Sequence, residues 1–386
     1  MKWEKVKLGN VCEITSSKRI FYSEYVDDGV PFYRSKEIIE SDEGKAIENP
    51  LYISVDKYNE IKEKFGVPQT GDMLLTSVGT IGIPYIIKKK DCFYFKDGNL
   101  TWFRDFREGL NSKYLYYWIK SSEGTGILYN TTIGSSQKAL TISALKNIKV
   151  SLPPRSVQDK IVEVVSAYDD LIENNQKQIK LLEEAAQRLY KEWFVDLRFP
   201  GHENTKIVDG VPEGWHRGTV GQIAEFKRGR TITKAQVKGG NVPVVAGGLE
   251  PAYYHNVANT KAPVITISAS GANAGFVRLY GVDVFASDCS FVDGLGTESL
   301  FFVYEFLKES KVSIDQLQKG SAQPHVYAKD INAMKITIPE KEYLERFDRY
   351  AKVYFNKIKT LQGQNERLKT ARNLLLAKLM SGEVEV

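Results

Sequence analysis

The sequence has few residues of the kinds that bind metals or cross-link chains. Its 386 residues include three cysteines, Cys12, Cys92 and Cys289, and four histidines, all widely separated. Zinc sites need closely spaced ligands and disulfide scaffolds need dense cysteine pairs, so neither class fits. No apolar run approaches the ~18 residues of a membrane helix, and the first residues lack the apolar core of a signal peptide. We therefore expect a cytoplasmic protein without a metal centre.

The excess of positive charge is also small. The chain has 53 Lys and Arg against 48 Asp and Glu, a formal net charge of +5, with 42% hydrophobic and 26% charged residues. Such a composition is ordinary for a folded globular protein and excludes disordered and fibrous classes. The charge permits nucleic-acid binding but does not by itself indicate it. At roughly 150 residues per domain, the length predicts two or three domains.

Two stretches of the sequence occur twice. Trp3–Ile14 reads again as Trp215–Phe226, and Gly134–Pro153 reads again as Gly320–Pro339. The offset falls from 212 residues (Trp3 to Trp215) to 186 (Gly134 to Gly320), so the second copy is 26 residues shorter inside. Chance similarity between amphipathic segments is the alternative, but the continuous register up to Pro153 disfavours it. We predict a tandem of two halves, each a globular block followed by a helix.

The interior of each block has the pattern of a mixed α/β domain with a β-rich core. The segments 72–79 and 262–271 are apolar, β-branched runs closed by glycine turns, as expected of strands. Helical patterns intervene at 112–119 and 298–309. We predict globular domains over residues 1–152 and 199–338, and long helices over 153–198 and 339–386.

Apolar residues recur every seven positions in both long helices. The first, from about Ser156 to Trp193, would be on the order of 57 Å long at ~1.5 Å per residue, longer than such a domain is wide. We therefore expect the two helices to pair as an antiparallel coiled coil within a pseudo-twofold repeat; the alternative is that each packs on its own domain. The predicted seam, which includes one asparagine from each helix, consists of Ile161, Val165, Tyr168, Ile172, Asn175, Ile179, Leu182, Leu189, Phe347, Tyr354, Ile358, Leu361, Asn365, Leu368 and Leu375.

Basic and amide side chains cluster where the pattern predicts turns between strands. Arginine and lysine hold phosphates or read guanine, and asparagine and glutamine read adenine. A surface Lys/Arg pair is more often ordinary solvated charge, so recurrence in both halves is what favours a functional interpretation. The candidate DNA-binding residues are Lys18, Arg19, Tyr33, Arg34, Ser35, Lys36, Ser77, Thr80, Ser135, Gln137, Lys138, Lys227, Arg228, Arg230, Ser270, Asn273, Ser321, Gln323 and His325.

Three segments together resemble a known family. They are Trp3–Ile14, the run GSSQKALTISALKNIKVSLPP before the first long helix, and RLYKEWFVDLRFPG with VPEGW before the second half. This combination is similar to the specificity subunit (HsdS type) of Type I restriction-modification systems. The resemblance implies two target recognition domains, each reading one half of a bipartite DNA sequence, with the paired helices setting the gap. One departure is the second loop, where Pro324-His325 stands in place of Lys138-Ala139.

The same resemblance implies partners and cofactors. It implies double-stranded DNA, two DNA adenine methyltransferase subunits that bind S-adenosylmethionine and dock on the helices, and restriction subunits that use ATP and Mg. It implies no cofactor and no catalytic residue in this chain. The alternatives are a recognition subunit of a related Type IIB/IIG-like methyltransferase-nuclease and a coiled-coil adaptor that does not bind DNA.

Motifs of the competing enzyme classes are missing. An amino-methyltransferase needs a [DN]-P-P-[YF] loop, but the Pro-Pro pair here reads Leu152-Pro-Pro-Arg155. There is no G-x-x-x-x-G-K-[ST] phosphate loop, and no proline is followed by aspartate as in PD-type nucleases. We therefore predict a non-catalytic, DNA-binding subunit.

Overall fold

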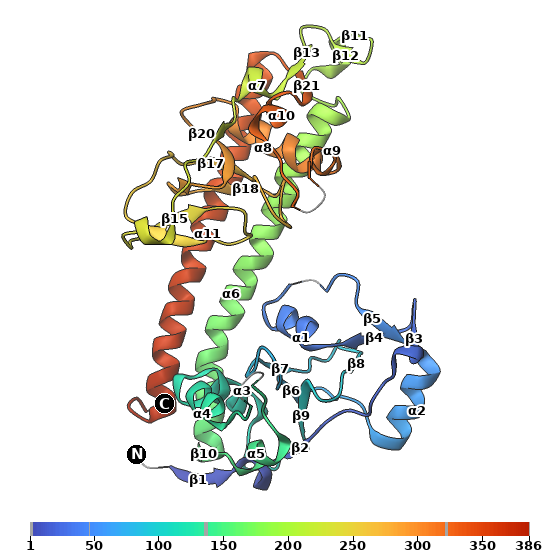
Figure 1. The fold of residues 1–386 in the computed structure, drawn as a ribbon, viewed down its shortest axis with the longest axis vertical. Coiled ribbons are helices and arrows are strands. Elements are labelled where there is room, and N and C mark those ends of the chain that lie inside the picture. Colours follow the sequence, from blue (N-terminus) through green and yellow to red (C-terminus); the bar gives the residue numbers. More distant parts are fainter. Residues whose placement is uncertain (1–2, 46, 135–137, 321–322, 386) are drawn as a thin grey trace. The chain divides into compact units, whose positions relative to one another are not determined.

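The computed structural model describes residues 3–45, 47–134, 138–320 and 323–385 and is a mixed α/β fold (Figure 1). It divides into two compact units: unit 1 comprises Met1–Asn174 and Asn365–Val386, and unit 2 comprises Asn175–Gln364. No helix of the described residues is long and apolar enough to cross a membrane. Each unit is described below by itself.

The described residues of unit 1 form three sheets. β1 (Glu4–Lys7) pairs antiparallel with β10 (Lys149–Leu152). The four-stranded sheet has the order β2 (Glu13–Thr15), β9 (Leu100–Arg104), β6 (Met73–Thr76) and β7 (Pro84–Ile86). A second four-stranded sheet has the order β3 (Tyr25–Val26), β5 (Leu51–Ile53), β4 (Val30–Tyr33) and β8 (Tyr94–Phe95). The helices of this block are α1 (Ser35–Asp42), α2 (Val55–Phe65), α3 (Ser112–Lys120), α4 (Ser122–Thr131) and α5 (Ile142–Asn147).

Unit 2 repeats this plan. β13 (His216–Thr219) pairs antiparallel with β21 (Lys335–Ile338). A four-stranded sheet has the order β14 (Lys227–Arg228), β20 (Cys289–Asp293), β17 (Val264–Ser268) and β18 (Val277–Tyr280). A three-stranded sheet has the order β16 (Tyr253–His255), β15 (Val242–Val245) and β19 (Phe285–Ala286). A hairpin of β11 (Ile207–Val208) and β12 (Val211–Pro212) precedes them. The helices are α7 (Val220–Ile223), α8 (Leu300–Glu309), α9 (Lys311–Gln316) and α10 (Ala328–Asn332).

The strand registers reproduce the sequence repeat. Glu4 lies opposite Leu152 in β1 and β10, and His216 lies opposite Ile338 in β13 and β21. These pairs are related by the same two offsets, 212 and 186 residues, that the sequence gives. The predicted mixed α/β fold with an internal repeat is therefore confirmed. β10 and β21 end at Leu152 and Ile338, the positions at which we placed the ends of the globular domains.

Two long helices contribute to both units. α6 spans Arg155–Tyr190 and is followed by a π-helical turn at Lys191–Val195; α11 spans Lys341–Ser381. In unit 1, Asp169 of α6 pairs with Arg372 near the end of α11, whereas in unit 2 Trp193 stacks edge-on with Phe347 near its beginning. Early residues of one helix thus contact late residues of the other, so the helices pack antiparallel.

The heptad positions face the interior. Every residue of the predicted seam is buried or half-buried, including Asn175 and Asn365, which are 8% and 5% exposed. In unit 1 the seam joins the core of the block, where Val165 of α6 and Leu376 of α11 share a cluster with Leu8 and Trp118; α3 and α4 lie against the first part of α6 (Figure 1). In unit 2, Phe347 and Ile358 likewise join the core of the second block.

Unit 2 places two carboxyl groups near its helix pair, the half-buried Asp348 and the buried Glu305. Asp348 of α11 accepts hydrogen bonds from the backbone N–H groups of Phe301 (3.2 Å) and Phe302 (2.9 Å), so it caps the first turn of α8 from another helix. Glu305 of α8 is 3% exposed. Burial raises the pKa of Glu305 to about 8, with the nearby Lys308 acting in the opposite direction.

Candidate nucleic-acid interface

In each unit, predicted site residues gather at one end of a four-stranded sheet. This sheet is β2-β9-β6-β7 in unit 1 and β14-β20-β17-β18 in unit 2. Beyond β6, Val78 forms a bridge with Ala139, and beyond β17, Ser270 forms a bridge with His325. Ala139 and His325 differ by the repeat offset of 186 positions. The structure therefore places Ala139 and His325, at the ends of the two predicted loops, beside equivalent strand ends.

Backbone hydrogen bonds close both loops in the same way. Ile133 and Ala139 exchange N–H···O=C bonds of 2.9 Å in each direction, and Lys319 and His325 do so at 2.9 and 2.8 Å. Such a two-way pair fixes the ends of a short loop. The candidate residues Ser135, Gln137 and Ser321 lie outside the described residues.

In unit 2 the candidate residues converge on Asp288. This aspartate lies immediately before β20, where Arg228 Nη2 contacts its Oδ1 at 3.0 Å and the Ser270 hydroxyl donates to its Oδ2. The bridge between Ser270 and His325 brings His325 to the same place. Residues that are 97 positions apart in sequence, from Arg228 to His325, thus form one cluster.

The backbone at Arg228 is held closely against the neighbouring strand. Lys227 and Arg228 pair with β20 as strand β14, so our prediction of a turn at these two residues was wrong. At Gly229, the N–H donates to the Cys289 carbonyl at 2.8 Å, and a Cβ would collide with the Ser287 carbonyl oxygen. The next residue, Arg230, donates its backbone N–H to the Ala286 carbonyl at 2.9 Å and exposes its side chain.

In unit 1 the basic residues Lys18 and Arg19 follow β2, the strand equivalent to β14. Arg19 Nε donates to Asp97 Oδ2 at 2.9 Å, and its side chain is 68% exposed. The Lys18 backbone N–H donates to the Tyr94 hydroxyl at 2.6 Å. Lys96, the first residue between β8 and β9, donates its backbone N–H to the Tyr33 carbonyl at 2.9 Å. The segment between β8 and β9 therefore brings Lys18 and Arg19 near the end of β4.

The second basic group of unit 1, residues 33–36, lies in regular structure. Tyr33 ends β4, and Ser35 and Lys36 begin α1, so the predicted turn is wrong here as well. The guanidinium of Arg34 donates to Glu37 through Nη2 (2.6 Å) and Nε (3.2 Å).

The partner of Arg34 is a buried carboxyl group. Glu37 is 1% exposed, and although burial raises its pKa, the Arg34 hydrogen bonds outweigh burial and lower it. The fork of Arg34 is thus occupied within the protein, and Glu37 also accepts from the Arg34 backbone N–H at 2.8 Å at the start of α1.

The remaining candidates differ in exposure. Ser77 is 1% exposed and its hydroxyl contacts that of Thr101 at 2.6 Å, which removes it from the surface. Thr80 and Gln323 are exposed, Lys36 is 64% exposed, and Asn273 is half-buried. Lys138 Nζ lies 3.5 Å from the centroid of the exposed Tyr129 ring.

Sequence reasoning missed the acidic and aromatic partners of the candidate residues. Asp97 and Asp288 hold Arg19 and Arg228, and Tyr129 and Tyr327 support Lys138 and His325. The only signal available was position, since Asp97 precedes β9 and Asp288 precedes β20, the strands that pair with β2 and β14. No group of three or more His, Cys, Asp or Glu side chains that could hold a metal ion occurs among the described residues.

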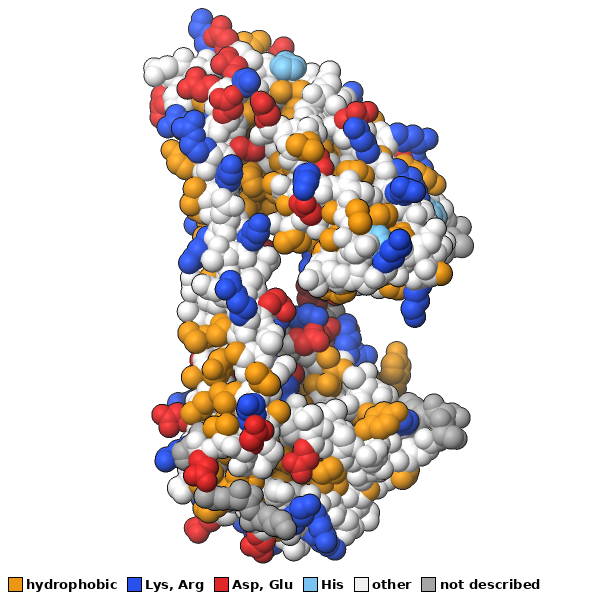
Figure 2. Space-filling view, turned by 90° about the vertical axis from the view of Figure 1, so that its left-hand side faces the viewer, with side chains coloured by type: hydrophobic (Ala, Val, Ile, Leu, Met, Phe, Trp, Pro, Cys, Tyr) orange, Lys and Arg blue, Asp and Glu red, His pale blue; other side chains and the backbone are white. Residues whose placement is uncertain are grey.

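The charge at the surface is mixed. On the face that Figure 2 draws, the lysine and arginine side chains lie dispersed among acidic and apolar ones and are not gathered into one patch. A surface of this kind suits contacts at chosen positions better than a continuous non-specific grip on phosphates.

Comparisons with known proteins identify the family of this chain. The model of the Type I restriction modification DNA specificity domain matches residues 1–184 and 212–370. The chain is 27% identical to the Type I restriction enzyme MjaIX specificity subunit of Methanocaldococcus jannaschii, in an alignment that covers 100% of this chain and 94% of that protein. It is 22% identical to the Type I restriction enzyme HindI specificity subunit of Haemophilus influenzae, over 64% of this chain and 71% of that one.

A solved structure shares the fold. The Type-I restriction-modification system S subunit from M. genitalium superposes with a TM-score of 0.60 at 17% identity, covering 98% of this chain and 96% of that one. The family model matches well over half of the sequence, once in each half of the repeat. The chain therefore belongs to the family of Type I restriction-modification specificity subunits.

Proposed function

We propose that this chain is the non-catalytic, DNA-reading subunit of a Type I restriction-modification enzyme and that each unit reads one half of a bipartite target. One observation carries the proposal: both units present arginine, hydroxyl and loop residues at the same end of equivalent four-stranded sheets. Two repeated units that present the same kinds of residue at the same end of a sheet suit a target that has two parts.

The chemistry of this edge suits base reading. Arginine can bond two acceptors of guanine at once, and loop amides and hydroxyls can donate to bases or phosphates. Arg19, Arg228 and Arg230 are exposed at strand ends, and Gln323 is exposed in the bridged loop. The sequence motifs of methyl transfer and of nucleotide hydrolysis are missing, so we assign the chemistry to partner subunits.

Methylome sequencing in the native host tests this function. We expect a bipartite motif whose methylation disappears when the gene for this chain is deleted, because the specificity subunit directs the methyltransferase. The complex rebuilt from this chain and its methyltransferase subunits should also bind a duplex with that motif more tightly than a scrambled one. A methylome that does not change on deletion would contradict the proposal.

We propose further that α6 and α11 set the number of base pairs between the two half-sites. Support comes from their lengths, 36 and 41 residues, and from the buried heptad residues along both. Deleting one heptad from each helix removes about 10 Å at ~1.5 Å per residue, which is about three base pairs at ~3.4 Å each. We expect the gap between the half-sites to shorten while both half-sites stay the same. An unchanged gap would refute the proposal that the helices set it.

We also propose which partner subunits form a complex with this chain. We assign two DNA adenine methyltransferase subunits with S-adenosylmethionine and restriction subunits with ATP and Mg to the complex, as the resemblance implies. In unit 1, a pocket of about 360 Å³ lies beside the helix pair, with apolar Leu128 and Leu376 in its lining and the 58% exposed Tyr129 at its rim. This pocket supports contact with a partner protein along the helices.

A further inference from the structure

In each unit, an exposed arginine is held by an aspartate at the same end of the corresponding sheet. Arg19 follows β2 and contacts Asp97 in the connection from β8 to β9. Arg228 lies in β14 and contacts Asp288 in the connection from β19 to β20. β2 and β14 are the equivalent first strands of the two four-stranded sheets. In each unit, an arginine in or after the first strand of the sheet therefore pairs with an aspartate that precedes the neighbouring strand, β9 or β20.

Each aspartate leaves most of its arginine available. Among the described residues, Arg19 uses only Nε for hydrogen bonding and Arg228 uses only Nη2. Their side chains remain 68% and 55% exposed. A guanidinium has five N–H donors, so each arginine retains a pair that can address two acceptors. Arg34 differs, because two of its nitrogens are bound to the buried Glu37.

The aspartate at Arg228 is itself fixed in place. The Ser270 hydroxyl occupies its second oxygen, and the Ala269 N–H donates to its carbonyl at 3.3 Å. The backbone after Arg228 is pinned by the Gly229 and Arg230 hydrogen bonds to the same segment. A guanidinium bonded to a fixed carboxylate loses less side-chain freedom when it meets a ligand than a solvated one.

The carboxylate also changes what the arginine prefers to bind. A negative charge at 3.0 Å from the guanidinium offsets its charge and repels a phosphate placed beside it. A guanine edge carries no net charge and offers two acceptors, O6 and N7, that match the free donors. An arginine held in this way is better suited to a base than to the backbone.

Building on the proposed function, we propose that Arg19 and Arg228 are specificity-determining residues that each read a guanine, with Asp97 and Asp288 as positioning residues. The neighbours Lys227 and Arg230 are exposed and have no ion pair among the described residues. In this scheme they contact phosphates and supply affinity without sequence information.

Variants of unit 2 separate the two roles. The complex of this chain with its methyltransferase subunits is titrated with a duplex carrying the wild-type motif, with single base-pair variants and with a scrambled duplex, over a range of salt. Arg228→Lys keeps the charge but loses the fork, so we expect discrimination at one base pair to fall roughly 5- to 140-fold with an unchanged salt slope. Lys227→Ala and Arg230→Ala, the matched controls, should each reduce the slope by ~0.9 and leave the motif unchanged.

Asp288→Asn tests the positioning residue. We expect weaker discrimination at the same base pair and tighter binding to the scrambled duplex, because a negative charge near the phosphates is removed. Thermal unfolding of each variant complex reports whether the fold is retained. Arg228→Lys that still discriminates every base pair, or Arg228→Ala that lowers the slope as the controls do, would overturn the assignment. A wild-type complex that binds both duplexes equally would instead refute the proposed function.

Discussion

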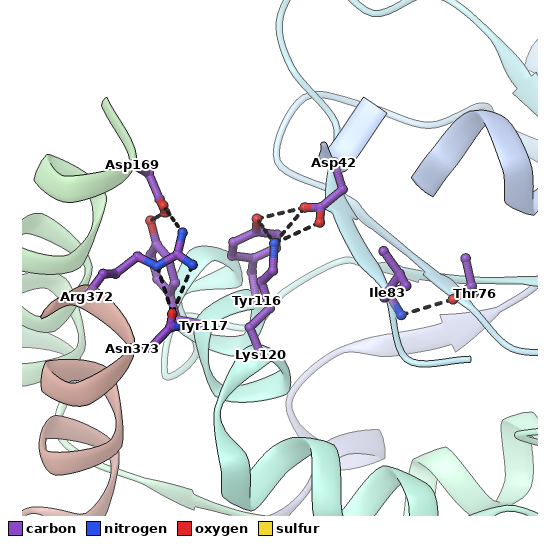
Figure 3. A network of polar contacts seen from close by, with 9 residues as sticks. All are labelled: Asp42, Thr76, Ile83, Tyr116, Tyr117, Lys120, Asp169, Arg372 and Asn373. Atoms are coloured by element: carbon purple, nitrogen blue, oxygen red, sulfur yellow. Dashed lines mark hydrogen bonds and ion pairs between the residues drawn. The ribbon is translucent and has the colours of Figure 1, made fainter. Parts of the chain in front are cut away.

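A charged residue occupies a heptad position of α11, and its contacts make a sharp prediction. Arg372 falls in the same heptad series as Ile358 and Asn365, where an apolar residue would be expected. In unit 1 its Nη1 donates to Asp169 of α6, and Asp169 also accepts from the Tyr117 hydroxyl of α3 at 2.7 Å (Figure 3). One carboxylate thereby connects both long helices to the globular block. Asn373 holds the other side of the guanidinium, with Oδ1 accepting from Nη2 at 2.9 Å.

The exposure of this ion pair sets the size of the effect. The side chains of Arg372 and Asp169 are 22% and 31% exposed, between a surface pair and a fully buried one. Surface pairs contribute about 0.2–1 kcal/mol, and breaking a buried pair costs about 3–5 kcal/mol. We therefore expect a coupling free energy of about 1.5 kcal/mol between the two residues, above the range of surface pairs.

A double-mutant cycle measures this coupling. Urea unfolding of the wild type, Arg372→Ala, Asp169→Ala and the double variant gives the coupling directly. The control is the pair of Lys180 and Glu184 on α6, which are 77% and 51% exposed and should couple by only about 0.3–0.5 kcal/mol. Equal coupling in the two cycles would show that the network does not fasten the helices to the block.

Three further predictions concern the cores and the candidate interface. Leu379→Ala, at a side chain with 0% exposure, should lower the free energy of unfolding by about 3 kcal/mol in denaturant titration, whereas Leu374→Ala, at 63% exposure, should change it little; equal costs would contradict the packing. Because burial raises the pKa of Glu305 from 4.5 to about 8, the folded state binds the proton more tightly than the unfolded state does. The contribution of this group to stability is therefore complete below pH 4.5 and falls by a few kcal/mol as the pH rises to 8. Glu305→Gln should flatten this dependence in melting curves, and an unaltered pH profile would refute the burial argument. Gly229→Ala should separate β14 from β20 and abolish recognition of one half-site in a methylome, whereas Gly126→Ala, where a Cβ meets nothing within 4 Å, should leave the motif intact.

The long-range plan of the fold was predictable because it is periodic or repeated. The heptad residues of α6 and α11 recur over many turns, and the pairs of β1 with β10 and of β13 with β21 share one sequence register. Errors arose where the signal is only a few residues long. β14 has two residues, so its strand character comes from pairing with β20, and α1 begins at Ser35 because Glu37 closes its cap with Arg34.

The candidate interface was predictable only in part. Position and residue type selected Arg19, Arg228 and the bridged loops, but not the aspartates that orient the arginines. Arg228 and Asp288 are 60 residues apart, and their contact depends on the order of strands in the sheet. From side-chain chemistry alone we also predicted that Ser77 contacts DNA, although its hydroxyl is buried against Thr101.

Exchange of one recognition block tests the central claim most directly. Residues 215–335, which contain β14, Asp288 and the 320–325 loop, are replaced by the corresponding block of a related specificity subunit, and the methylome of the host is sequenced. If each unit reads its own half-site, one half of the motif changes and the other half and the gap remain as in the wild type. A change in both halves, or in neither, would contradict the account.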